Sequence, residues 1–138
     1  MCKNVNKIVC AAALAIVFFV NLNGQSMDYV FRGEEIMKKS SSNDSRYYEF
    51  IRSNALHCGI YNLKKGVRDE QQPHELDELY YVIEGESKFM VASEEFDVVA
   101  GDVIYVPAHL EHRFFDMRED LKLLVFFSEV QISKTDNK

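Results

Sequence analysis

Proline and glycine are scarce in this chain, with two and six residues among 138. This scarcity excludes a collagen-like repeat, which needs glycine at every third position. Hydrophobic residues make up 47% of the sequence and charged residues 28%, so the composition is not that of a disordered protein. A length of 138 residues predicts one globular domain.

Positive charge is also in short supply. Lys and Arg together number 16, against 22 Asp and Glu, and the formal net charge is -6. Proteins that bind nucleic-acid phosphates carry an excess of positive charge. We therefore expect no nucleic-acid partner.

The longest unbroken apolar run, residues 8–20, has only 13 residues. A helix needs about 20 apolar residues to cross a bilayer, so we expect no stable membrane insertion. Lys3 and Lys7 precede the run, and a polar stretch that ends at Ser26 follows it. This order is typical of a secretory signal peptide, so we predict one at residues 1–26 and export to the periplasm or the exterior.

Cysteine is almost absent from the predicted mature chain. Cys2 and Cys10 fall within the signal peptide, which leaves Cys58 and no internal disulfide. Cys58 lies in the apolar segment 55–60, which has the character of a buried strand. A buried thiol in apolar surroundings is usually an inert part of the core, so we expect that role here.

Long helical periodicity is missing beyond residue 45. Residues 34–39 predict a short helix and residues 40–45 a polar linker, whereas the remainder alternates short Val-, Ile-, Tyr- and Phe-rich segments with turns. Such spacing predicts an all-β sandwich or barrel. The expected strands are 47–51, 55–63, 79–83, 87–92, 95–99, 103–106, 113–115 and 121–127. The predicted divisions are the signal at 1–26, the helix and linker at 27–45, the β domain at 46–130 and a C-terminal tail at 131–138.

Two histidines and a carboxylate stand out as candidate metal ligands. His74, Glu78 and His112 make a donor set that suits non-haem iron and also zinc. On a straight strand His74 and Glu78 would lie about 13 Å apart, so a shared ion requires the chain to turn through residues 75–77. Gln72 would lie on the same strand face as His74, close enough to share an ion with it.

The spacing of these residues resembles the two sequence motifs of the cupin family. Both family motifs begin with a glycine; the first ends with a glycine and the second with an asparagine. This chain departs from them by Gln for the first His, His for a Gly, and Asp for an Asn. The first motif here is Gly66, five residues, Gln72-Pro73-His74, three residues, Glu78, six residues, Gly85. The second is Gly101, five residues, Pro107-Ala108-His109, two residues, His112, three residues, Asp116. Fifteen residues separate the motifs, as in small single-domain bacterial members.

The resemblance implies an all-β, cupin-like double-stranded β-helix, a jelly-roll barrel of six to eight strands with a divalent metal at its centre. It assigns His74, Glu78 and His112 as ligands, with Gln72 as a weak fourth ligand or a hydrogen-bonding neighbour. Fe(II) is the first choice, followed by zinc, manganese and nickel. The resemblance also implies a homodimer, because cupins often pair through strand edges.

Three functions fit these expectations. The first is a metal-dependent oxygenase or isomerase for a small organic molecule, with Glu78 or His109 as candidates for proton transfer. The second is a non-catalytic exported module that holds a sugar, another small metabolite or the metal itself. The third is a structural or dimer-forming domain with an empty pocket. His57 has no partner motif, and we interpret it as a surface or hydrogen-bonded residue.

Overall fold

The computed structural model describes residues 29–128, which form one helix and eight strands. The predicted signal peptide and the predicted tail at 131–138 lie outside these residues. Each expected strand is present, with ends that differ by at most one residue. The elements are α1 (Gly33–Ser41), β1 (Tyr47–Arg52), β2 (Leu56–Leu63), β3 (Glu78–Glu84), β4 (Glu86–Val91), β5 (Glu94–Val99), β6 (Val103–Val106), β7 (His112–Phe115) and β8 (Leu121–Ser128).

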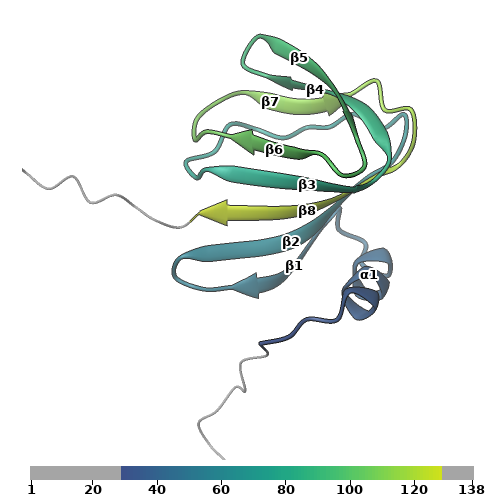
Figure 1. Cartoon of the computed structure of the whole chain (residues 1–138), viewed down its shortest axis with the longest axis vertical. Coiled ribbons are helices and arrows are strands. Elements are labelled where there is room, and N and C mark those ends of the chain that lie inside the picture. Colours follow the sequence, from purple (N-terminus) through teal and green to yellow (C-terminus); the bar gives the residue numbers. More distant parts are fainter. Residues whose placement is uncertain (1–28, 129–138) are drawn as a thin grey trace, which may run out of the picture.

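The strands form two antiparallel sheets (Figure 1). The larger has the order β1-β2-β8-β3-β6 and the smaller the order β5-β4-β7. From β3 onward the chain passes repeatedly between the sheets, because β4, β5 and β7 belong to the small sheet and β6 and β8 to the large one. This alternation is the double-sheet arrangement of a jelly roll, so the predicted all-β class is confirmed.

Side-chain alternation on β3 decides which face of the large sheet is covered. Glu78, Tyr80 and Val82 are at most 1% exposed, whereas Leu79 and Tyr81 are 36% and 41% exposed. Successive side chains of a strand point to opposite faces, so the first three residues face the small sheet. A carboxylate, Glu78, is therefore carried into the interior by the same alternation that buries its apolar neighbours.

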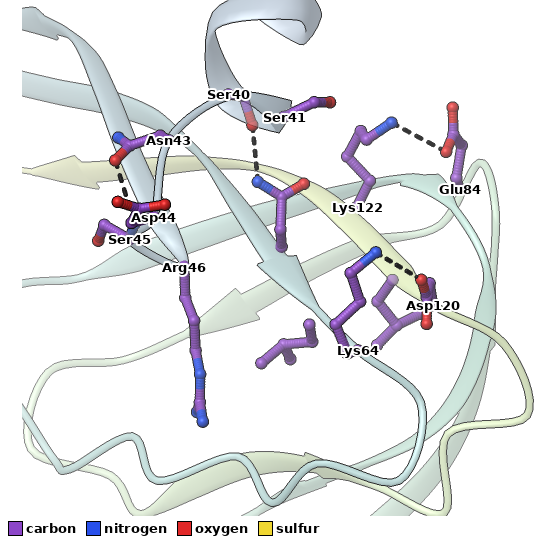
Figure 2. A pocket seen from close by; sticks show the side chains of 13 residues that line it. Ser40, Ser41, Asn43, Asp44, Ser45, Arg46, Lys64, Glu84, Asp120 and Lys122 are labelled. Atoms are coloured by element: carbon purple, nitrogen blue, oxygen red, sulfur yellow. Dashed lines mark hydrogen bonds and ion pairs between the residues drawn. The ribbon is translucent and has the colours of Figure 1, made fainter.

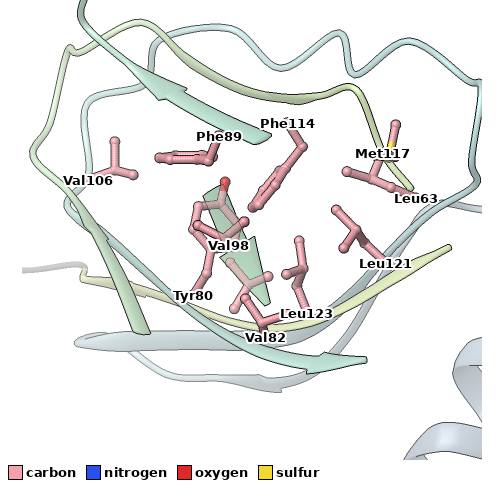
Figure 3. Packing of buried hydrophobic residues seen from close by; sticks show 11 residues of the cluster. Leu63, Tyr80, Val82, Phe89, Val98, Val106, Phe114, Met117, Leu121 and Leu123 are labelled. Atoms are coloured by element: carbon pink, nitrogen blue, oxygen red, sulfur yellow. The ribbon is translucent and has the colours of Figure 1, made fainter. Parts of the chain in front are cut away.

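The core lies between the two sheets (Figure 3). Tyr80 and Val82 of β3 and Leu123 of β8 come from the large sheet, and Phe89 of β4 and Phe114 of β7 come from the small one. The ring centroids of Phe89 and Phe114 are 4.7 Å apart, within the range of favourable aromatic contacts. The Tyr80 ring of the large sheet packs against both, with centroid distances of 6.1 Å to Phe89 and 5.3 Å to Phe114, so the three rings join the two sheets.

Helix α1 packs on the large sheet and includes the helix expected at residues 34–39. Its first turn is acidic and its last turn basic, which complements the helix dipole. Asn62 of β2 donates a hydrogen bond of 2.6 Å to the buried Ser40 Oγ, which fixes the end of the helix (Figure 2). No helix within residues 29–128 combines the length and apolar character that a membrane crossing requires.

A shallow pocket of about 300 Å³ lies beside the end of α1 (Figure 2). Two ion pairs border it, Lys64 with Asp120 at 2.7 Å and Lys122 with Glu84 at 3.0 Å. Solvent-accessible pairs of this kind contribute about 0–1 kcal/mol each. None of the predicted metal ligands lines this pocket, so we do not assign the chemistry to it.

Cys58 is buried in the sheet, as the sequence predicts. Its exposure is 1%, and burial raises the pKa of its thiol to about 11. The reactive thiolate is therefore rare near neutral pH, which supports the interpretation of Cys58 as an inert core residue.

Gly85 joins β3 to β4 in a conformation that other residues rarely adopt. Its φ is +97°, and a Cβ placed there would collide with the Asp120 carbonyl and lie 2.8 Å from the Leu121 side chain. Gly101 has a similar φ of +100°, but a Cβ there would meet nothing within 4 Å. Substitution of Gly101 therefore tests the backbone strain alone, whereas substitution of Gly85 tests the strain together with a steric collision.

We predict that Gly85→Ala lowers the free energy of unfolding more than Gly101→Ala. Both substitutions impose a positive φ on alanine, at a cost of about 1 kcal/mol. Gly85→Ala must also displace backbone at Asp120, so we expect a total loss of about 2 kcal/mol or more. Urea denaturation measures both values, and equal losses would show that the Asp120 contact has no energetic weight.

Candidate metal centre

Two segments that are distant in sequence, one with His74 and Glu78 and the other with His112, meet at one end of the barrel. Glu78 is the first residue of β3, His112 is the first residue of β7, and His74 lies in the connection that leads into β3. Because β3 and β7 belong to different sheets, the cluster bridges the two layers. The structure thus brings three of the four predicted ligands together.

The chain bends between His74 and Glu78, as a shared ion requires. Asp77 stabilises the bend, because its carboxylate accepts hydrogen bonds from Ala108 N at 2.9 Å and from the Tyr105 hydroxyl at 3.0 Å. The Asp77 carbonyl also accepts a hydrogen bond from Ser128 N at 3.0 Å. Asp77 is therefore a structural part of the site and not simply a solvated turn residue.

The three side chains converge on the Glu78 carboxylate. His74 Nε2 lies 2.9 Å and His112 Nε2 lies 3.1 Å from Glu78 Oε2. One potential ligand atom from each residue falls within 4.8 Å of the other two. The side chains of Glu78 and His112 are almost fully buried, whereas that of His74 is 27% exposed. Solvent therefore reaches the cluster from the His74 side.

Backbone carbonyls determine the tautomer of both histidines. His74 Nδ1 lies 2.7 Å from the Leu76 carbonyl oxygen, and His112 Nδ1 lies 2.8 Å from the Leu110 carbonyl oxygen. A carbonyl can only accept, so each Nδ1 carries a proton and donates it. In the neutral rings, both Nε2 lone pairs then face the Glu78 carboxylate. Metal-binding histidines are commonly oriented by such a bond from the second ring nitrogen.

This arrangement requires a cation. Three acceptor atoms at short range repel one another unless a proton or a metal ion lies between them. Glu78 Oε1 and His112 Nε2 are buried and have no hydrogen-bond partner within residues 29–128. Burial disfavours a charge on His112, but the Glu78 carboxylate and the Leu110 carbonyl outweigh burial, and the pKa of His112 is raised. The two imidazoles, the carboxylate and their atoms without a hydrogen-bond partner fit a divalent metal ion. A proton would compete with the metal ion for the same nitrogen and oxygen atoms.

A pocket of about 300 Å³ opens next to His74. Its ring packs edge-on against Phe127, with centroids 5.3 Å apart, and Phe127 in turn packs edge-on against Tyr47. The far side of the pocket is charged, because Arg52 forms a two-pronged ion pair with Glu49 at 2.7 and 2.8 Å. The pocket therefore places the partly exposed His74 ring beside aromatic side chains and a charged pair.

Gln72, the predicted fourth ligand, is exposed, and its amide donates a hydrogen bond of 3.2 Å to the Glu70 carbonyl. Gln72 borders a second hollow of about 700 Å³. His112 also borders this hollow, but its side chain has no solvent-exposed surface. Metal ligation by Gln72 stays a prediction.

The two remaining histidines take different positions. His57 is buried, and Arg52 Nη1 donates to its Nε2 at 3.2 Å, which agrees with the expected hydrogen-bonded role. His109 is exposed with a φ of +68°, which explains why the corresponding family position is glycine. Its backbone N–H donates to the His74 carbonyl at 2.7 Å. A role for the His109 side chain in proton transfer stays a prediction.

A buried carboxylate that sequence reasoning missed fastens the loop before His74 to the small sheet. Asp69 is 3% exposed and accepts hydrogen bonds from Tyr61 Oη at 2.8 Å, Gln71 Nε2 at 2.9 Å and Phe114 N at 2.9 Å. Gln71 also accepts the Tyr80 hydroxyl at 2.7 Å. Asp69 lies in a polar loop without periodicity or motif, so no sequence signal could have identified it.

The chain is similar to known proteins in the region that carries this cluster. The profile of the family described as cupin domain matches residues 59–127. An uncharacterized protein of Streptomyces coelicolor is 40% identical over 98 residues, which cover 71% of this chain and 93% of that protein.

Two solved structures illustrate the likeness in fold. An RmlC-like cupin from Shewanella frigidimarina superposes with a TM-score of 0.62 at 20% identity, covering 77% of this chain and 95% of that one. KdgF from Halomonas sp. gives a TM-score of 0.56 at 20% identity, covering 62% and 79%. At these identities the likeness concerns the fold alone.

We predict that Asp69→Asn destabilises the protein by about 1–3 kcal/mol, because the amide presents donors to groups that are themselves donors. Glu70→Gln is the matched control, since it removes the same charge from the exposed neighbour and should change stability by no more than about 0.5 kcal/mol. Denaturant unfolding of both variants measures the difference. Equal stability of the two variants would contradict a structural role for Asp69.

Proposed function

The chain belongs to the cupin family, and on this basis we propose that it is a metal-dependent enzyme that acts on a small organic molecule. His74, Glu78 and His112 would hold one divalent ion. The observation that carries this proposal is the convergence of two imidazole Nε2 atoms and a carboxylate in a buried site. Such a cluster is costly to bury unless a cation occupies it.

Iron(II) is the first choice of metal, with zinc, manganese and nickel as alternatives. Two histidines and one carboxylate leave positions for exogenous ligands, as in non-haem iron oxygenases. When bound, a divalent ion supplies Lewis acidity toward an oxygen-bearing substrate, which would serve an oxygenase or an isomerase. The pocket beside His74 offers a volume of about 300 Å³, at the lower end of the range for small-molecule sites.

This chain's own residues would orient the ligand and exclude water. The carbonyls of Leu76 and Leu110 hold the histidine rings in one tautomer, so no proton transfer is needed within the rings before an ion binds. Phe89 and Tyr80 pack against His112 at centroid distances of 6.3 and 6.4 Å, which lowers the local dielectric constant. Catalytic residues beyond the cluster are not assigned.

A non-catalytic module that binds a sugar, another metabolite or a metal is the second candidate. The position of Gln72 favours it, because this side chain is exposed and bonded to the Glu70 carbonyl, where the family motif has a histidine. For either function we propose export, on the basis of the sequence of residues 1–26. A homodimer is a further proposal, supported by the exposed edge strands β1 and β6 of the large sheet.

We predict that tag-free protein binds about one divalent ion per chain and that His74→Ala and Glu78→Gln abolish this binding. The ion should stabilise the fold by about 2.7 kcal/mol at a free concentration of 100 times its Kd. Elemental analysis and thermal unfolding measure the two effects. His109→Asn is the matched control, because the exposed His109 lies outside the cluster and asparagine tolerates its positive φ. Full metal content in Glu78→Gln would contradict the assignment.

Turnover distinguishes the two candidate functions. We expect protein reconstituted with Fe(II), Mn(II), Ni(II) or Zn(II) to consume oxygen or to form product with at least one of a set of enediols, phenols and sugars. Glu78→Gln should lose this activity along with its metal. Stabilisation by one of these compounds without any turnover would instead support the binding module.

A further inference from the structure

Tyr80 carries a hydroxyl group into the apolar core of the barrel (Figure 3). The residue has no exposed surface, and its ring packs against Phe89 and Phe114. A buried hydroxyl in a native protein nearly always has a hydrogen-bond partner. The partner of this hydroxyl is Gln71 Oε1 at 2.7 Å, in the loop that leads from β2 to His74.

The amide group of Gln71 has only one favourable orientation. A backbone N–H can only donate, so Asp69 Oδ2, which lies 2.9 Å from Phe114 N, is an acceptor. Gln71 places its amide 2.9 Å from the same carboxylate oxygen and must therefore present Nε2 to it. Gln71 Oε1 then faces the Tyr80 hydroxyl and accepts its proton. The direction of this hydrogen bond is thus fixed by the backbone of β7.

The Tyr80 phenol lies close to the Glu78 carboxylate. The two residues are separated by one position in β3, so their side chains stand on the same face of the strand. Both also reach His112, at 6.4 Å between the ring centroids for Tyr80 and 3.1 Å from Nε2 for Glu78 Oε2. Burial raises the pKa of the phenol well above its ordinary value, and the charge of Glu78 raises it further. The phenol therefore keeps its proton beside a carboxylate.

A protonated phenol beside a carboxylate ordinarily donates a hydrogen bond to it, because bonds to a charged acceptor are the stronger ones. Glu78 Oε1 is nevertheless buried without a hydrogen-bond partner among residues 29–128. The proton that could satisfy this oxygen is held by Gln71 instead. The negative charge of Glu78 therefore stays available to a cation.

We propose that Gln71 is a positioning residue of the metal site: by accepting the Tyr80 proton, it keeps this hydroxyl from donating to Glu78. The inference rests on the proposed metal function, because its consequence is a carboxylate left free for the ion. Gln71 is the last of the five residues after Gly66 that the first sequence motif leaves unspecified.

Gln71→Met tests the role of the amide, because methionine has a similar length but makes neither hydrogen bond. The freed Tyr80 hydroxyl should then donate to Glu78, and an ion would have to displace this bond in order to bind. We expect the Kd of the full chain for Co(II) to rise about tenfold, as for one hydrogen bond to a charged group. Titration followed by the visible absorption of Co(II) measures the Kd.

The double variant Gln71→Met/Tyr80→Phe distinguishes this role from a purely structural one. Loss of the hydroxyl removes the competing donor, so the double variant should recover the Co(II) affinity of the unmodified protein. Tyr80→Phe alone should bind Co(II) at least as tightly as the unmodified protein. Persistence of the weak binding in the double variant, or tenfold weaker binding in Tyr80→Phe alone, would overturn the proposal.

Ser40→Ala is the matched control for the loss of a buried hydrogen bond. Ser40 is 2% exposed and accepts a hydrogen bond from Asn62 at the end of α1, outside the metal cluster. This substitution should lower the midpoint of thermal unfolding by several degrees and leave the Kd for Co(II) unchanged. Tenfold weaker Co(II) binding in Ser40→Ala would overturn the proposal, because it would show that metal affinity simply follows stability.

The inference and the proposed function fail in different ways. An unchanged Kd for Co(II) in Gln71→Met would overturn the role of Gln71 and leave the metal site intact. Failure of the unmodified protein to bind Co(II) would overturn the metal function and, with it, the role of Gln71.

Discussion

The need for positive charge between Glu78 and two histidines is the constraint on which the rest of the site depends. Nδ1 of each histidine is committed to a backbone carbonyl, so the rings can turn only Nε2 toward the carboxylate. Three acceptors then share a space from which water is largely excluded. A proton between two of these atoms removes only part of their mutual repulsion, whereas a divalent ion can bind all three atoms together. The metal interpretation therefore has a physical basis beyond the likeness to the family.

The barrel maintains this unfavourable cluster by fixing each contributor from a different direction. Alternation along β3 carries Glu78 inward with Tyr80 and Val82, and pairing of β7 with β4 holds His112 in the opposite layer. Contacts of Asp77 with Ser128 and Ala108, and of Asp69 with Phe114, fasten the loop that carries His74. Because these restraints come from both sheets, the cluster cannot relax without disturbing the core between them.

The sequence is sufficient to predict the strands, the bend before Glu78 and the convergence of His74, Glu78 and His112, because local periodicity and motif spacing determine these features. It is not sufficient to identify Asp69 or its link through Gln71 to Tyr80. The partners of Asp69 come from residues 61, 71 and 114, and Gln71 in turn accepts a hydrogen bond from Tyr80 in β3. Pairings across the fold leave no periodic pattern along the chain. The tautomers of His74 and His112 likewise depend on carbonyl positions that only the folded backbone defines.

Unsatisfied groups gather in this protein where a ligand is expected. Within residues 29–128, the buried side-chain atoms that lack a hydrogen-bond partner are Tyr47 Oη, Glu78 Oε1 and His112 Nε2. Two of them belong to the candidate metal cluster, and the third belongs to Tyr47, a residue that lines the adjoining pocket. Each lowers the stability of the fold, and a cation would satisfy the two that belong to the His74, Glu78 and His112 cluster. Their clustering is difficult to attribute to poor packing, because the apolar core beside them is almost completely buried. Binding of a cation between Glu78 and the two histidines would stabilise the fold, because it would satisfy the buried atoms of the cluster.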